Sequence, residues 1–247
     1  MNAIVLSREI RDNRSYTLAW TIIMTVMLIA NTLGVVLPAR AAGEDYDVPA
    51  ALATGIANML YCGPIFAMIL GGIIISREED EKTIEFLLAH PITRTEIAAS
   101  KLLAFTVQAV FLSAVLAAAG LILIAALGGW TASGAAAYLS LSLSYFVMTF
   151  GFGAAGTFLS MFVVKGGAVV GLSIGIPMIL AILAFLQNTD NELLRLIASL
   201  SPFKYLDVAS IMSTARVDVP FVSVAAAVSA ALLAGSIALY KRKEFSA

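Results

Sequence analysis

Charged residues divide the chain into long apolar stretches. Asp, Glu, Lys, Arg and His are absent from the intervals 15–39, 48–76, 102–164, 166–189 and 219–240. A helix that crosses a bilayer needs about 20 apolar residues, so four intervals hold one span each and the longest holds two. We predict six membrane-spanning helices, at 16–37, 54–75, 102–127, 138–162, 166–186 and 219–239, with a break near Gly128 and Gly129.

Composition agrees with an all-α integral membrane protein. Of 247 residues, 60% are apolar and 13% are charged, which is about half the charged share of a soluble domain. This excludes a soluble enzyme and a disordered chain, and the balance of 15 Lys and Arg against 16 Asp and Glu excludes a nucleic-acid-binding protein. We therefore treat residues 1–247 as a single transmembrane domain.

The basic residues predict an orientation. Eleven of the 15 Lys and Arg fall in the segments 1–15 and 77–101, at Lys165 and after the last span. Basic residues mark the cytoplasmic side of a membrane protein. Both termini are therefore predicted to be cytoplasmic, in a plasma membrane, and the loop that contains Glu44 is predicted to lie outside.

The segment 190–218 lies on the outer side of this topology. Leu193, Leu194, Ile197 and Leu200 fall on one helical face, and Ser201-Pro202 ends that helix before a second amphipathic turn. Short amphipathic helices of this kind lie on or dip into a leaflet, because they are too short and too charged to cross it.

Small residues four positions apart predict close contact between helices. Gly63, Ala67 and Gly71 form such a series in the second span. A ridge of three glycines, Gly167, Gly171 and Gly175, forms another in the fifth span, and we expect it to pack within one subunit rather than across a dimer. Pro64 and Pro177 are expected to bend their spans.

Four polar residues inside spans are candidates for a substrate path: Asn31, Asn58, Tyr61 and Gln108. A polar side chain in lipid must find a partner, so a hydrogen bond between helices is the alternative for Gln108 and is the favoured one. The spans contain no ionisable residue at depth, which argues against an ion-coupled transporter.

The cytoplasmic segment 77–101 has the most distinctive pattern. We predict a short helix over 78–89, with an apolar face formed by Ile84, Leu87 and Leu88. Pro91 prevents its continuation, and Thr93 with Glu96 forms a T-x-x-E capping box that begins the next helix. An apolar face beside acidic residues predicts a docking surface.

Catalytic motifs are missing from the sequence. The chain has no phosphate-binding P-loop and no G-x-S-x-G nucleophile motif, and its single histidine and single cysteine, His90 and Cys62, form no zinc site. We predict that the chain is no enzyme and binds no cofactor or metal itself.

The residues 76–97, followed by Ser-Lys-Leu at 100–102, resemble the signature of ABC-2-type transporter permeases, roughly E-x-G-T-[IL]-E-x-L-L-x-x-P-[IV]-[ST]-R-x-x-[IV] with [SG]-K-L further on. The stretch 201–207 resembles the small bacterial permeases of this family. Lys82 stands where many members have glycine, and we expect the helix to be better formed there.

The resemblance covers the whole chain and implies a bacterial or archaeal membrane subunit. It implies an amphipathic cytoplasmic N-terminal helix over 1–15, a coupling helix between spans two and three, and outer helices between spans five and six. It also implies assembly of two permeases, identical or paralogous, with two separate ATPase subunits that bind ATP and Mg²⁺. The residues expected to dock onto the ATPase are Glu78, Glu79, Glu81, Thr83, Ile84, Glu85, Phe86, Leu87, Leu88, Pro91 and Arg94.

Within this segment, Arg94 and Lys101 are expected to hold the loop to itself or to lipid phosphate. The resulting prediction is a permease subunit of an ATP-driven exporter. The alternative is a channel, or a non-transporting membrane anchor, that is regulated by a bound ATPase. An apolar path would suit lipids or amphipathic peptides as substrates.

Overall fold

The computed structural model describes residues 3–44, 46–83 and 92–243. Its helices are α1 (Ala3–Ala42), α2 (Val48–Asn58), α3 (Cys62–Asp80), α5 (Arg94–Ala126), α6 (Ala132–Leu159), α7 (Gly166–Phe185), η1 (Leu186–Asn188), α8 (Glu192–Ala198), η2 (Pro202–Tyr205), α9 (Val208–Thr214) and α10 (Val219–Arg242). The described residues contain no strand, which agrees with the predicted all-α class.

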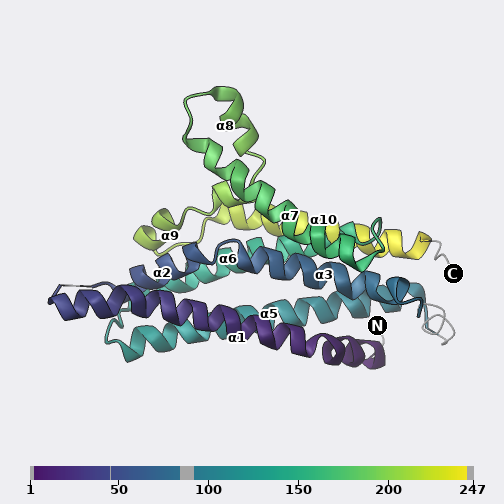
Figure 1. Cartoon of the computed structure of the whole chain (residues 1–247), viewed down its shortest axis with the longest axis horizontal. Coiled ribbons are helices and arrows are strands. Elements are labelled where there is room, and N and C mark those ends of the chain that lie inside the picture. Colours follow the sequence, from purple (N-terminus) through teal and green to yellow (C-terminus); the bar gives the residue numbers. More distant parts are fainter. Residues whose placement is uncertain (1–2, 45, 84–91, 244–247) are drawn as a thin grey trace.

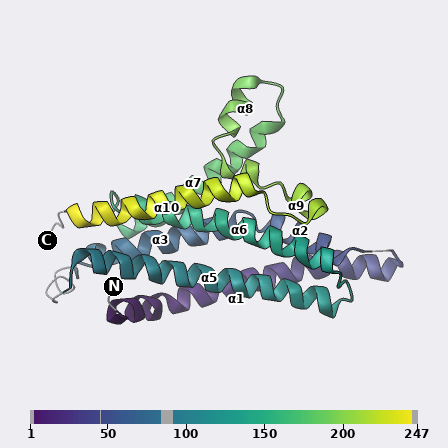
Figure 2. The same ribbon diagram turned by 180° about the vertical axis from the view of Figure 1, so that it is seen from behind.

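The long helices run side by side in one bundle (Figure 1). The beginnings of α1 and α5 lie at the same end of this bundle as the ends of α3 and α10, and we call it the charged end (Figures 1 and 2). Helix α3 packs on α6 and α7, α1 packs on α5, and α10 packs on α6. Helix α8 stands away from the side of the bundle (Figures 1 and 2).

Five single helices, α1, α5, α6, α7 and α10, are long and apolar enough to cross a membrane. The bent pair α2 and α3, with an angle of 49° between its two halves, is a sixth candidate when the pair is taken as one span. The predicted span over 54–75 thus corresponds to two helices, and the bend expected near Pro64 is a break between Asn58 and Cys62. The loop between α5 and α6 falls at Gly128, whose φ of 75° requires the left-handed conformation.

Helix α1 contains both the predicted N-terminal helix and the first span, and the two are continuous. It has 40 residues, so it is about 60 Å long, twice the hydrocarbon thickness of about 30 Å. No break separates residues 3–15 from the span. The predicted N-terminal segment is thus a rigid extension of the span rather than a separate element.

The break between α2 and α3 is bridged by Tyr145 of α6. Its hydroxyl donates to the Met59 carbonyl oxygen at 2.9 Å and accepts from the Gly63 amide at 3.1 Å. Backbone groups freed by a break in a membrane helix must find partners inside the protein. Tyr145 satisfies the Gly63 amide and adds a second donor at the Met59 carbonyl oxygen, which also accepts from the Cys62 amide at 2.9 Å. It thereby ties both sides of the bend to α6.

Glycine contacts join α3 to α6. A Cβ added at Gly71 would collide with the Gly153 carbonyl oxygen, and one added at Gly156 would collide with the Met68 carbonyl oxygen. This confirms the close contact predicted from the small residues of the second span. By contrast, nothing lies within 4 Å of such an atom at Gly167, Gly171 or Gly175, so the expected packing of this ridge within the subunit is wrong.

Candidate functional site: a buried ion cluster beside the 83–93 segment

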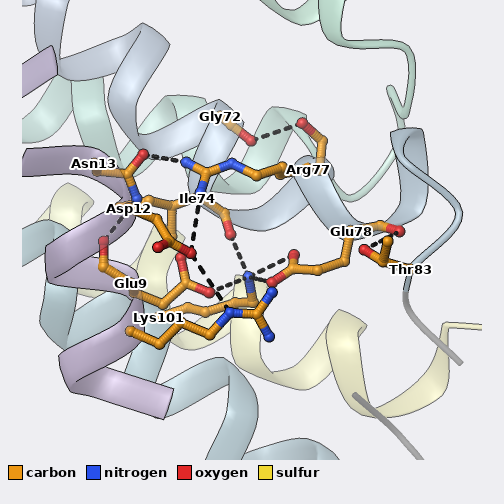
Figure 3. Close-up of polar contacts among 11 residues, drawn as sticks. Glu9, Asp12, Asn13, Gly72, Ile74, Arg77, Glu78, Thr83 and Lys101 are labelled. Carbon is orange, nitrogen blue, oxygen red and sulfur yellow. Dashed lines mark hydrogen bonds and ion pairs between the residues drawn. The ribbon is translucent and has the colours of Figure 1, made fainter. Parts of the chain in front are cut away.

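Lys101, in the second turn of α5, is fully buried at the charged end of the bundle. Its Nζ donates to Glu9 Oε1 of α1 at 2.9 Å and to the carboxylate of Glu78 of α3 at 2.6 Å. A third bond of 2.6 Å reaches the Ile74 carbonyl oxygen. Figure 3 shows the Lys101 ammonium between these groups. The cluster joins α1, α3 and α5 at one point.

The buried charges of this cluster are paired with one another and hydrogen-bonded. An ammonium has three donors, and all three of Lys101 are used. Glu9 and Glu78 are both at least 96% buried. A buried charge is tolerated only with good pairing and hydrogen bonding, so removing the lysine would leave two carboxylates without compensation.

A second set of contacts lies beside the cluster and also joins α1 to α3 (Figure 3). The Arg77 guanidinium donates to Asn13 Oδ1 and lies 3.8 Å from Asp12. The Asn13 amide donates to the Glu9 carbonyl oxygen at 2.9 Å. Arg77 and Asp12 are partly exposed, so water screens this pair and it contributes less than the buried cluster.

The end of α10 is tied to the same region. Lys243 Nζ lies 2.6 Å from the Glu79 carboxylate of α3 and donates to the Ser160 carbonyl oxygen at 3.4 Å. Its own carbonyl oxygen accepts a 2.7 Å hydrogen bond from Arg94, the first residue of α5. Ion pairs and hydrogen bonds therefore connect the ends of α1, α3, α5 and α10.

Helix α3 ends in a Schellman motif at the start of the 83–93 segment. The Thr83 amide donates to the Glu78 carbonyl oxygen at 2.7 Å, and the Lys82 amide donates to the Glu79 carbonyl oxygen at 3.3 Å. Lys82 has a φ of 55°, a left-handed conformation that glycine adopts at much lower cost. The expectation of a better-formed helix at Lys82 is wrong, because the helix ends there.

The other end of the segment is fixed by the predicted capping box. The Glu96 amide donates to Thr93 Oγ1 at 3.2 Å, and the Thr93 amide donates to the Glu96 carboxylate at 3.2 Å. Two backbone donors at the start of α5 are satisfied in this way. Both ends of the 83–93 segment are thus held by specific local structure.

The predicted docking residues have different positions. Glu78 lies inside the cluster and Glu79 in the pair with Lys243, where its side chain is 6% exposed. These carboxylates belong to the end of α3 and not to a separate helix that begins at residue 78. Glu81 is exposed and Thr83 is partly exposed. The other predicted docking residues except Arg94, namely Ile84, Glu85, Phe86, Leu87, Leu88 and Pro91, lie outside the described residues.

The candidate path residues do not converge. Gln108 is buried and accepts a hydrogen bond from the Thr17 hydroxyl of α1, which is the alternative favoured from the sequence. Asn58 donates to Asn31 Oδ1 at 2.7 Å. Thr17 and Asn31 are 14 residues apart on α1, or about 21 Å, so the two pairs lie at different depths.

Tyr61, the fourth candidate, lies in the break between α2 and α3. Its ring makes an edge contact with Phe203, with the ring centroids 5.1 Å apart. This contact joins the break to η2. Each of the four candidates therefore contacts another element of the chain.

Sequence reasoning missed the main residues of the cluster. Glu9 was not singled out. Lys101 was expected to hold the 77–101 segment to itself or to bind lipid phosphate, and its bond to Glu78 agrees with the first of these. The available signal was the position of Lys101 directly before the uncharged interval 102–164, where a charge must either leave the membrane or find buried partners. Its partners lie 92 and 23 residues away in the sequence, so no local pattern identifies them.

Comparisons with known proteins agree with the architecture. Residues 6–188 match a family model described as ABC-2 family transporter protein. The match includes the ion cluster and the 83–93 segment. No curated protein matches the chain. Among the described residues, no group of three or more His, Cys, Asp or Glu is placed to hold a metal ion.

Proposed function

Because the chain belongs to the ABC-2 family of transporter proteins, whose members are membrane components of ABC transporters that associate with an ABC ATPase, we propose that it is the permease subunit of an ATP-driven exporter. Two copies, or one copy and a paralogue, assemble with two ATPase subunits in the plasma membrane. ATP and Mg²⁺ bind to the ATPase subunits, and this chain binds no cofactor. Both termini lie in the cytoplasm.

The observation that carries this proposal is the anchoring of the 83–93 segment at both ends. The Schellman motif at Lys82 and the capping box at Thr93 fix its two attachment points. Directly behind these points, Lys101 joins α5 to α1 and α3. A partner that contacts this segment would act on several helices at once, which is what a coupling element requires.

In the proposed mechanism, closure of the ATPase subunits displaces the 83–93 segment. The displacement reaches α3 and α5 through their capped ends. The buried cluster passes it to α1, and the contact of Glu79 with Lys243 passes it to α10. Separating these helix ends would leave buried charges without partners, which is energetically costly. The helix ends are therefore expected to move together.

A pull-down experiment tests the docking role of the segment. Tagged permease with Phe86 and Leu87 both changed to Ser is co-expressed with its cognate ATPase subunit. We expect loss of the ATPase, because a buried aromatic and aliphatic pair at a docking site typically contributes at least about 2 kcal/mol to binding. The membrane insertion should be unchanged, since the uncharged intervals are intact.

The control for this experiment is Glu44→Lys, at an exposed position in the loop between α1 and α2, which should retain the ATPase. Glu81→Lys with Glu85→Lys should weaken binding less, and mainly at low salt, because charges at the rim of an interface are screened. Wild-type recovery of the ATPase by the Phe86/Leu87 variant would show that docking occurs elsewhere.

Cysteine labelling tests the proposed orientation. In a Cys62→Ala background, cysteines at Asp47 and Asn191, both exposed, should react with an impermeant thiol reagent added outside intact cells. A cysteine at Glu81, exposed at the charged end, should react only after the cells are opened. Labelling of Glu81→Cys from outside would reverse the topology.

A further inference from the structure

An apolar groove lies between α6, α7 and α10. Its volume is about 690 Å³, and its walls include Phe152 and Ala155 of α6, Leu180 of α7, and Phe221, Val228 and Leu232 of α10. Helix α10 packs on α6 and α5, whereas α7 packs mainly on α3 and η2. Helix α6 contacts both of them, and all three are candidate membrane spans.

The depth of the groove matches one leaflet. Along α10 it extends from Phe221 to Leu232, which is eleven residues or about 16 Å of helix. Half of the hydrocarbon core is about 15 Å thick. The groove therefore ends near the middle of the membrane. A helix from a second copy would be expected to contact α10 over its whole length, whereas the groove covers only about half of α10. The length of the groove therefore favours a hydrocarbon chain as its occupant.

Polar groups occur at only one end of the groove. Asp218 and Tyr205 line it there, at the end away from the charged end of the bundle. The Asp218 carboxylate caps α10 by accepting from the Phe221 amide at 3.1 Å. Among the described residues that line the groove, Asp218 is the one with a charge. Lys204 lies close by, with its ammonium 5.8 Å from the centre of the Tyr205 ring.

We propose that this groove binds one acyl chain of a phospholipid with an ammonium headgroup, of the phosphatidylethanolamine type. The acyl chain fills the space between α7 and α10, the ammonium pairs with Asp218, and the phosphate lies toward Lys204. The lipid belongs to the outer leaflet in the proposed orientation, and to this extent the inference rests on the proposed function. Such a lipid fixes the spacing of α7 and α10.

Photolabelling tests the site. The full chain is reconstituted in vesicles of phosphatidylethanolamine and phosphatidylglycerol that contain a phosphatidylethanolamine with a diazirine in the middle of one chain. We expect cross-links to peptides that line the groove around Leu180 and Val228. With the diazirine near the headgroup, the cross-links should shift toward Tyr205 and Phe221.

Two matched pairs of variants make the test specific. Ala225→Trp fills the groove, because Ala225 lines it, whereas Ala227→Trp places the same ring two residues away at an exposed position of α10. Labelling of the groove should fall to the level of other lipid-facing peptides in the first variant and stay unchanged in the second. Both variants are compared for oligomeric state by light scattering.

Asp218→Asn tests the headgroup. Asparagine keeps the helix cap but removes the charge, and we expect about a tenfold loss of preference for phosphatidylethanolamine over phosphatidylglycerol labels, as for one charge-assisted hydrogen bond. Glu192→Gln, exposed on α8, is the control and should keep the preference. An unchanged preference in Asp218→Asn would overturn the headgroup assignment.

Two outcomes would overturn the site itself. One is labelling of the groove in the wild type that is no stronger than at other lipid-facing peptides. The other is an Ala225→Trp variant that turns dimers into monomers while the wild-type groove stays unlabelled, which would make the groove an interface between two copies. Labelling needs no ATPase, so a failed pull-down would refute the proposed docking without affecting this result.

Discussion

Replacement of Lys101 by Met is the strongest test of the ion cluster. Methionine keeps most of the volume of the side chain and removes the charge. Glu9 and Glu78, which lie 2.9 Å and 2.6 Å from Nζ, then lose their cation in an almost fully buried site. Breaking a buried ion pair by removing one partner costs about 3–5 kcal/mol. Because two carboxylates are affected, we expect the upper part of this range.

The assay is thermal unfolding of the purified protein in mild detergent, followed by tryptophan fluorescence. Trp20 of α1 reports on the right contact, because its ring packs against Phe66 of α3 with the centroids 5.7 Å apart. We expect a large decrease in the unfolding temperature for Lys101→Met. Lys241→Met, at an exposed lysine of α10, should change the free energy of unfolding by less than about 0.5 kcal/mol.

The triple variant Glu9→Gln, Glu78→Gln, Lys101→Met separates loss of the pair from loss of packing. This variant contains no buried charge at the site. Replacing a whole group of buried ions can leave the free energy of unfolding nearly unchanged. We therefore expect it to recover much of the stability lost in Lys101→Met. Equal unfolding temperatures for Lys101→Met and Lys241→Met would refute the reasoning.

The other predictions use the same unfolding assay. Tyr145→Phe should cost about 1–3 kcal/mol, because it leaves the buried Gly63 amide at the α2–α3 break without its partner; an unchanged unfolding temperature would contradict the bridging role. Lys82→Gly should stabilise the chain by up to about 1 kcal/mol, since it relieves the left-handed conformation, and Lys82→Val should do the opposite. Gly71→Leu should cost at least about 1–3 kcal/mol by forcing α3 from α6, whereas Gly171→Leu should be near neutral, and the reverse order would contradict the packing.

The spans were predictable because their signal is local. Membrane insertion depends on charge-free length, and the uncharged intervals give that length directly. The capping box at Thr93 was predictable for the same reason, since all its atoms lie within four residues. The helix end at Lys82 was missed because the backbone there has a conformation that lysine rarely adopts.

Features that depend on distant partners were not predictable. Pro64 indicates a bend in the second span, but the position of the break is set by Tyr145, more than 80 residues away. The glycine ridges of the second and fifth spans have the same spacing, yet only one lies against another helix. Spacing identifies a smooth strip on a helix and does not say what that strip faces.

Different interactions hold different parts of the bundle together, and this decides where it can change shape. Backbone contact at Gly71 leaves no space for α3 to slide on α6. The buried charges around Lys101 keep α1, α3 and α5 together at one end. Helices α7 and α10 instead face a groove of about 690 Å³, across which apolar side chains can rearrange at little cost. If the ATPase acts on the 83–93 segment as proposed, α3 and α6 would move together, and the spacing of α7 and α10, which the proposed lipid fixes, would change only when the groove is emptied or refilled.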